Sequence, residues 1–317
     1  MPAAISAPFL KVSSHLGLPP TAAASAQVLW NFTSRDTDLT KIENLSSLHT
    51  FTGTKDEEWF YLISVAIEAR GAKVIPIMLR AMDAVRLNNA ELVSQCLLEF
   101  ADCVEDVGIM LERMNENCSP DIFYHQIRPL LAGSKNMSAA GLPKGVFYED
   151  EDGKGEWHQH SGGSNAQSSL IQFLDIVLGV EHHPTKSSGA EPKGKHGFLQ
   201  EMREYMPGGH RRFLEHIESV ANIREYVQTS TSGEQVTAAY NLAVARLGEL
   251  RDTHIKIVTR YIIGPSRRAA ISPSSGLNLA IASTNRKSAD ALPGTGGTVL
   301  IPFLKQTRDE TKATSLS

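Results

Sequence analysis

Residues 249–263 read ELRDTHIKIVTRYII, and this stretch decides the fold class. From about Gln235 to Ile263, apolar residues return every three or four positions, which is the period of an α-helix with one buried face. His254 falls on that apolar stripe, at a position where leucine would be ordinary. The stretch therefore predicts a long core helix and raises the question of what the histidine does.

The same helical period dominates the rest of the chain, and alternating β-type patterns are few. We therefore predict an all-α protein. Three segments rich in Gly, Pro or Ser interrupt the pattern and are predicted to be loops, the last of them mobile: 133–156, 181–197 and 264–293. The clearest helices are expected over 57–70, 73–87, 90–117, 120–131, 165–178, 210–220 and 235–263.

Composition excludes several classes of function. With 317 residues and 41% hydrophobic residues, the chain can bury one large core or two smaller ones. The net charge of -4 and the absence of a Lys/Arg block argue against nucleic acid as a partner. Three cysteines in helix-like sequence suggest a reducing compartment. Because neither a signal peptide nor a membrane-spanning apolar run is visible, we expect a cytoplasmic protein.

Two interpretations of His254 follow from its position. A histidine on an apolar face is most often a core residue whose ring nitrogens are satisfied by local partners. Alternatively, an imidazole that projects from a helix into an apolar slot can serve as an axial ligand of haem iron. Arg251 lies three residues earlier on nearly the same face, where it could meet an acidic haem edge. Neither residue decides the question by itself.

A second candidate site lies in IFYHQIR, residues 122–128. Tyr124 and Arg128 are four positions apart, so they share a helix face, and a planar guanidinium can grip a carboxylate with two parallel hydrogen bonds. A surface salt bridge is the alternative role for Arg128. His125 is expected to face solvent. The glycines of GTGGT, residues 294–298, suggest a phosphate loop, but no Lys-Ser/Thr pair follows them, so a Walker motif is rejected.

Taken together and in order, several stretches resemble the indoleamine 2,3-dioxygenase family of haem enzymes. The resemblance runs from about Leu10 to Thr311. It implies an all-α haem-binding catalytic domain over residues 51–317, preceded over residues 1–50 by the remnant of a small domain and its linker. The segments that carry it are FYLISVAIEA (60–69), SPDIFYHQIRPLLAG (119–133), SGGSNAQSSLIQFLDIVLG (161–179), EMREYMPGGHRRFLEHIE (201–218), LRDTHIKIVTRYI (250–262) and GTGGTVLIPFLKQTRDET (294–311).

The resemblance assigns roles residue by residue. It implies that His254 is the proximal ligand of the haem iron and that Arg251 lies near a haem propionate. It implies that Ser64 is a catalytic serine beside bound oxygen, although alone it would be an ordinary helix serine. Ser164 could equally cap the following helix. The residues implied to bind substrate are Phe123, Tyr124, Arg128, Gly163, Ser164 and Thr295.

The implied activity is insertion of both atoms of O2 across the C2–C3 bond of L-tryptophan, giving N-formylkynurenine. This reaction is the first step of the kynurenine pathway toward NAD. The resemblance implies one haem b per chain, and we expect a monomer that acts on L-tryptophan and dioxygen without nucleic acid or membrane. A truncated, catalytically impaired haem-binding or regulatory paralogue is the alternative, and a haem-free helical scaffold is a third.

The sequence also departs from the family. Family members carry a small helical domain upstream, and the chain opens near the last part of it, so we expect an incomplete wall on the oxygen-binding side and slow turnover. Ala24 and Gln27 stand where animal relatives carry tyrosine and cysteine. Tyr124 stands where many members have phenylalanine, and Asn165 where some have alanine. These four positions are expected to change the lining of the pocket.

Overall fold

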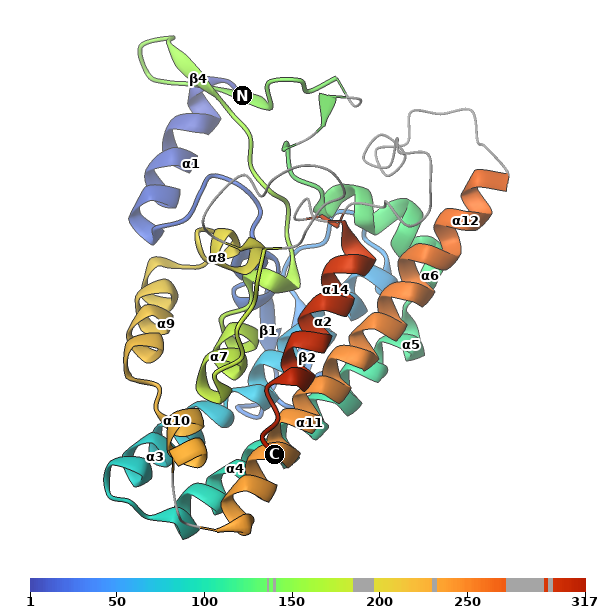
Figure 1. Ribbon diagram of the computed structural model, residues 1–317. Coiled ribbons are helices and arrows are strands. Elements are labelled where there is room, and N and C mark those ends of the chain that lie inside the picture. The colour runs from blue at the N-terminus through green and yellow to red at the C-terminus, as the bar shows by residue number, and fades with distance from the viewer. Residues whose placement is uncertain (136, 139–140, 185–196, 230–232, 272–293, 296–298) are drawn as a thin grey trace.

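The computed structural model describes residues 1–317 except 136, 139–140, 185–196, 230–232, 272–293 and 296–298. It confirms the all-α prediction, because helices build most of the described chain and its strands are few and short (Figure 1). The helices are α1 (Ala3–Leu16), α2 (Lys55–Gly71), α3 (Val74–Arg86), α4 (Ala90–Glu112), α5 (Met114–Asn117), α6 (Pro120–Ile122), α7 (Ser169–Leu178), α8 (Phe198–Arg203), α9 (Gly208–Val220), α10 (Ile223–Thr229), α11 (Glu234–Val258), α12 (Gly264–Ile271) and α14 (Leu300–Ala313).

The core lies where the two longest of these helices pack along each other. Helix α4 has 23 residues and α11 has 25, and they run side by side through the molecule (Figure 1). Helix α11 buries the predicted apolar stripe, including Tyr240, Val244 and Leu247. The Tyr240 hydroxyl donates to the carbonyl of Leu178 at 2.6 Å, which satisfies the one polar atom of a fully buried ring.

Helix α11 does not end in a loop, contrary to the prediction for residues 264–293. It continues through a π-helical segment, η7 (Thr259–Ile263), into α12. The Tyr261 hydroxyl hydrogen-bonds the carbonyls of Met114 and Cys118, each at 2.9 Å, so tertiary contacts fix η7, through which the helix runs on into α12. The rest of the predicted mobile loop, 272–293, lies outside the described residues.

The first predicted loop was also wrong in part, because residues 133–156 contain most of a β-hairpin. Strand β3 (Val146–Glu149) pairs antiparallel with β4 (Gly155–His158). The acidic, glycine-rich composition concealed a short run of good strand formers at Val146–Tyr148. Tyr148 is buried, and its hydroxyl donates to the carbonyl of Pro20 at 2.7 Å. Partners distant in sequence therefore fix this hairpin.

The first fifty residues pack onto the helical body. They contain α1, the π-helical segment η1 (Ser25–Leu29) and a hairpin of β1 (Phe32–Ser34) with β2 (Leu45–Ser47), joined through the 3₁₀ turn η2 (Ile42–Asn44). Segment η1 and strand β2 both lie against α2. The division of the chain into two domains stays a prediction.

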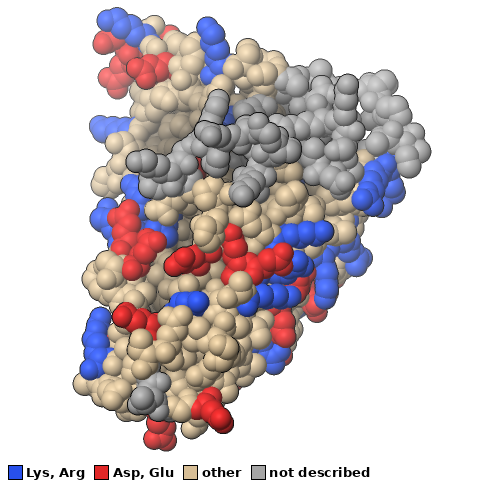
Figure 2. All heavy atoms as spheres, in the orientation of Figure 1, with Lys and Arg blue, Asp and Glu red and all other residues tan. Residues whose placement is uncertain are grey.

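The surface carries mixed charge. On the face in Figure 2, Lys and Arg side chains are interspersed with Asp and Glu, without a large patch of one sign. Within the described parts of the chain, no helix has the length and apolar character that crossing a membrane requires. This face therefore has no concentrated charge that would steer a polyanion.

Candidate active site

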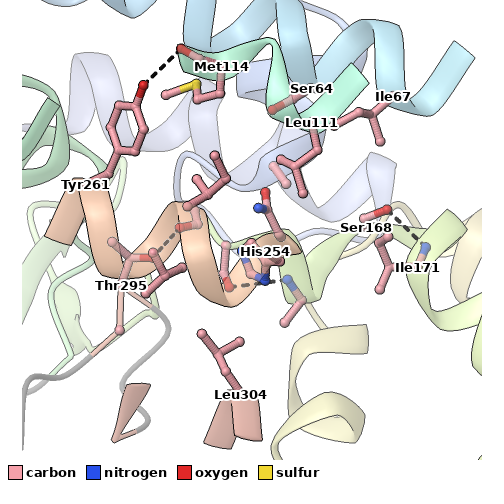
Figure 3. Close-up of a pocket in the computed structure, with 18 of the residues that line it drawn as sticks. Ser64, Ile67, Leu111, Met114, Ser168, Ile171, His254, Tyr261, Thr295 and Leu304 are labelled. Atoms are coloured by element: carbon pink, nitrogen blue, oxygen red, sulfur yellow. Dashed lines mark hydrogen bonds between the residues drawn. The ribbon is translucent and has the colours of Figure 1, made fainter. Parts of the chain in front are cut away.

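A cavity of about 270 Å³ opens between α2, α11, α14 and a set of short turns. His254 lies near its middle, with Met114 and Tyr261 toward one end and Ser168 and Ile171 toward the other (Figure 3). Most of the lining is apolar, so the few polar side chains that reach it mark where a ligand would be oriented. Two walls of the cavity differ in construction: one is a regular helix and the other a set of short turns.

The first, called here the α11 wall, is one face of α11. Its residues are Leu247, Leu250, Arg251, His254, Ile257 and Val258. His254 has no hydrogen-bond partner for either ring nitrogen among the described residues. Burial, aided by the charge of Arg251, lowers the pKa of His254 to about 4. The ring is therefore neutral at physiological pH, which is the form that binds a metal.

His254 is therefore not a core histidine whose ring nitrogens are hydrogen-bonded by neighbouring described residues. His254 is half-buried, and the surface that it exposes lines the cavity. One turn away on α11, Leu250, Ile257 and Val258 are apolar. Arg251, one turn before His254, is paired with Asp175. The α11 wall therefore presents one uncommitted imidazole to the cavity.

Behind the α11 wall lies a buried ionic network that was not predicted. Arg251 Nη2 donates to Asp175 Oδ1 of α7 at 2.5 Å. The other oxygen of Asp175 is 3.1 Å from His182 Nε2, and His182 Nδ1 is 2.7 Å from Glu310 Oε2 of α14. Burial opposes ionisation of Asp175, but the charges of Arg251 and His182 outweigh it and lower the pKa of that carboxyl. The network thus links α7 and α14 to Arg251 on α11, the residue predicted to meet a haem propionate.

The Nε of Arg251 is buried without a hydrogen-bond partner among the described residues, while Nη2 donates to Asp175. Because the pair with Asp175 orients the guanidinium plane, the Nε–H has a defined direction. An acidic group of a ligand could therefore meet Arg251 without displacing Asp175.

The second wall, called here the turn wall, is built from irregular segments. It combines π-helix η1, π-helix η3 (Phe123–Ile127), the 3₁₀ turn η4 (Arg128–Leu131) and the chain before the 3₁₀ turn η6 (Asn165–Gln167). Isolated π-helical turns occur often at functional sites because they displace side chains from the regular helical register. The residues that this wall contributes to the cavity are Ala24, Gln27, Val28, Phe123, Arg128, Leu131, Gly163, Ser164 and Asn165.

Two glycines allow these turns to meet. A Cβ on Gly162 would lie 2.0 Å from the backbone oxygen of Leu131, and a Cβ on Gly163 would lie 2.1 Å from Gln27 Oε1. Both distances are far inside van der Waals contact. A side chain at position 162 would therefore clash with backbone, and one at position 163 would require Gln27 to move. The absent side chains serve packing within the turn wall. Gly163 N–H also donates to the Leu131 carbonyl at 3.1 Å.

Ser164 caps the turn that follows it, which is one of its two predicted roles. Its hydroxyl accepts from Ala166 N–H at 3.3 Å, and Gln167 Oε1 accepts from Ser164 N–H at 3.4 Å. This capping box fixes the first turn of the chain leading into α7. Ser164 also lines the cavity, so the capping and lining positions hold together.

Arg128 is a buried side chain, which contradicts the alternative of a surface salt bridge. It is 4% exposed, and burial lowers its pKa, although arginine remains protonated. Its guanidinium lies 5.6 Å from the ring centre of Tyr124, as the shared helix face predicted. Phe123 lines the cavity, whereas Tyr124 lies behind Arg128 and is absent from the lining. His125 is exposed, as expected.

The remaining predicted residues also reach the cavity. The Ser64 hydroxyl lines it while donating to the Phe60 carbonyl at 3.2 Å, one turn earlier on α2. Thr295 Oγ1 donates to the Gly163 carbonyl at 2.7 Å, and the Thr295 carbonyl accepts from Gly162 N–H at 3.2 Å. The structure thus brings Ser64, Thr295 and the glycine turn around one cavity.

Sequence reasoning missed a half-buried carboxyl group in this cavity. Glu68 lines it one turn beyond Ser64, and burial raises the pKa of Glu68. The Ser168 hydroxyl donates to Glu68 Oε1 at 2.5 Å. The four-residue spacing from Ser64 placed Glu68 on the same face of α2 and was the signal available. Asp175 and His182 gave no comparable signal, because their partners are distant in sequence.

The fold and the cavity define a class: a helical protein that encloses an apolar ligand pocket between a histidine-bearing helix and a wall of turns. A sequence model of indoleamine 2,3-dioxygenase matches residues 1–314. The chain belongs to the indoleamine 2,3-dioxygenase family. Members of this family are haem-dependent oxidoreductases that act on indole substrates, and the chain is accordingly an enzyme of the dioxygenase type.

Three relatives show the range of the family. The chain is 45% identical to an indoleamine 2,3-dioxygenase of Aspergillus nanangensis, over 98% of the chain and 74% of that relative. It is 42% identical to the indoleamine 2,3-dioxygenase of Saccharomyces cerevisiae, over 99% of the chain and 73% of the relative. A 6-hydroxytryptophan 2,3-dioxygenase of Fusarium equiseti is 36% identical, over 98% of the chain and 74% of the relative.

Proposed function

We propose that the chain is a haem-dependent dioxygenase that converts L-tryptophan to N-formylkynurenine. The observation that carries the proposal is the neutral, uncommitted imidazole of His254 facing an apolar cavity. A planar apolar cofactor with a metal at its centre is the ligand that such a wall suits. Family membership supports the same chemistry.

The residues present fit one haem b per chain. His254 would hold the iron, and the uncommitted Nε of Arg251 would meet a propionate. Apolar side chains such as Leu250 and Leu304 would cover the macrocycle. When bound, the haem supplies the activation of O2, and the reaction needs no other oxidant because both oxygen atoms enter the product. The C2–C3 bond of the indole breaks, and each carbon gains one oxygen.

The turn wall would orient the substrate. Arg128 would bind the carboxylate, since a buried guanidinium gives a strong, directional pair with it. Phe123 would lie against the indole, while Tyr124 would stack on Arg128 and hold it in place, which modifies its predicted role as a direct contact. Holding the ring in one orientation lowers the entropic part of the barrier.

The remaining predicted residues would close the site. The hydrogen bond between Thr295 and the Gly163 carbonyl would keep water away from the reacting ring. Ser64 would offer its hydroxyl beside bound oxygen and the indole, and Ser164 would shape the pocket through its capped turn. We further propose that the protein works as a cytoplasmic monomer, in the first step of the kynurenine pathway toward NAD.

One experiment separates this function from its alternatives. The purified chain is titrated with haem, and the visible spectrum and product formation from tryptophan under reducing conditions are recorded. A histidine-type Soret band with N-formylkynurenine as product is the expected result. A Soret band without turnover of any indole would favour the impaired haem-binding paralogue. Absence of haem uptake would contradict both.

A further inference from the structure

The Gln27 side chain is the least explained polar group in the cavity. It sits on η1, is 8% exposed and lines the cavity. Its amide nitrogen, Nε2, is buried without a hydrogen-bond partner among the residues that the structure describes. The amide oxygen, Oε1, has no partner there either, so exchanging the two ends of the amide would not satisfy it. A buried amide without partners destabilises a protein unless a ligand completes it.

Hydrogen bonds hold the backbone that carries the Gln27 side chain. The Gln27 carbonyl accepts from Asn31 Nδ2 at 3.2 Å. The neighbouring Ala24 N–H donates to Gln167 Oε1 at 2.9 Å, which is the oxygen that also completes the Ser164 capping box. The amide oxygen lies against Gly163, where an added Cβ would be only 2.1 Å away. Gln27 therefore reaches the cavity beside Gly163, from a backbone position that hydrogen bonds hold in place.

The chemistry of the surroundings limits what the amide can recognise. Phe60, Ile63 and Phe123 line the same cavity and offer no hydrogen bonds. Arg128 and Gln27 line the same cavity, so with the substrate carboxylate at Arg128 we place the indole ring among these apolar side chains and beside Gln27. The six-membered ring of plain indole offers only C–H groups. A hydroxyl on that ring both donates and accepts, which matches the two ends of an amide.

We propose that Gln27 selects indole amino acids that carry a hydroxyl on the six-membered ring. This inference rests on the proposed function, because it assumes an indole amino acid bound in the cavity. A site that hydrogen-bonds a substrate hydroxyl discriminates strongly against analogues that lack it, since its polar groups are then left unpaired. The hydroxylated substrate completes the Gln27 amide, and an unsubstituted or methylated ring leaves it unbonded.

The test compares substrates on the haem-loaded full chain. The kcat/KM values are measured for tryptophan, the 5-, 6- and 7-hydroxytryptophans and the corresponding methyltryptophans. For the favoured ring position, Gln27→Met should lower the ratio of hydroxy to methyl substrate by about 10- to 100-fold. Gln27→Leu provides a second apolar replacement if the first folds poorly. The control Gln228→Met, an exposed position on α10, should leave the ratio unchanged.

Binding supplies a readout apart from turnover. Titration of the ferric protein, followed by the visible spectrum, gives Kd for each substrate, and the hydroxy-to-methyl ratio of Kd should change as the kcat/KM ratio does. Without substrate, Gln27→Met should raise Tm, because an unpaired amide is removed. A ratio that Gln27→Met does not change, or equal loss for every substrate, would overturn the proposal.

The two levels of proposal fail differently. If tryptophan is turned over but Gln27→Met leaves the hydroxy-to-methyl ratio of kcat/KM unchanged, only the inference about Gln27 is wrong. If no indole amino acid is turned over by the haem-loaded protein, the proposed function is lost, and the Kd ratios still decide whether Gln27 reads a ring hydroxyl.

Discussion

The α11 wall and the turn wall face the same cavity but are stabilised in different ways. The α11 wall is one continuous helix whose buried face follows the helical period, braced from behind by the Arg251–Asp175 pair. The turn wall joins four short segments whose positions depend on glycine contacts, a capping box and long-range backbone hydrogen bonds. A regular, braced helix gives a side chain that would bind a metal one defined orientation. Irregular turns let several side chains converge on a substrate.

The largest expected effect is on the α11 wall. His254→Ala should abolish stable haem binding while the protein remains helical, because alanine is a good helix former and the lost interaction is metal ligation. Haem titration with far-UV circular dichroism measures both properties. The control His216→Ala, on an exposed face of α9, should keep full haem content. A histidine-type haem spectrum in His254→Ala would show that another residue holds the iron.

In the turn wall, the loss of unfolding free energy on replacing a glycine by alanine should depend on which atoms the added methyl group contacts. Gly162→Ala drives a methyl into the Leu131 backbone, so we expect a loss of about 3 kcal/mol in unfolding free energy. Gly163→Ala meets only the end of the flexible Gln27 side chain and should cost about 1 kcal/mol. Urea unfolding measures both.

The control is Gly209→Ala on α9, where an added Cβ meets nothing within 4 Å. It should be neutral or slightly stabilising, because alanine favours the helix. Equal losses for Gly162→Ala and Gly163→Ala would mean that the backbone of the turn wall is softer than its contacts indicate.

A smaller effect tests substrate orientation by the turn wall. Arg128→Ala should raise the KM for tryptophan by about one to two decades at unchanged haem content, because a charge-assisted pair worth about 1.5–3 kcal/mol is lost. Tryptamine, which lacks the carboxylate, should be affected little. Arg128→Lys should recover only part of the loss, since lysine cannot pair through two parallel donors. Equal losses for tryptophan and tryptamine would place the carboxylate elsewhere.

The smallest effect concerns the network behind the α11 wall. Burial alone would lower the pKa of His182, but hydrogen bonds and charge from Asp175 and Glu310 outweigh it and raise that pKa above the ordinary value of 6.5. The charged imidazole binds both carboxylates more tightly in the folded state. Its stabilisation is therefore complete below about pH 6.5 and is lost as the pH rises through the raised pKa.

Calorimetry against pH measures this contribution. Between pH 6 and pH 9, Tm should fall by about 2–4 °C more for the unmodified protein than for His182→Gln, corresponding to about 1 kcal/mol. The glutamine variant keeps a hydrogen-bonding side chain but cannot titrate. Parallel curves for the two proteins would show that His182 does not link Asp175 to α14 through its charge.

The sequence by itself determined the helical class, because the apolar period of each long helix is a local property of the chain. It placed His254 on the inward face of α11 and Arg128 beside Tyr124, since spacing alone sets which side chains share a helix face. It also offered both roles of Ser164, as a cap and in the pocket lining. These features need no knowledge of distant partners.

Only the tertiary structure decided how the site is completed. The β3–β4 hairpin, the continuation of α11 into α12 and the pairing of His182 with Asp175 and Glu310 all depend on contacts between residues far apart in sequence. Tyr124 is outside the lining for the same reason, because the packing of η3 and η4 brings Phe123 and Arg128 to the cavity and leaves Tyr124 away from it. The residues next to Gln27 in the sequence could not show whether its amide has a hydrogen-bond partner. The groups around that amide come from distant parts of the chain.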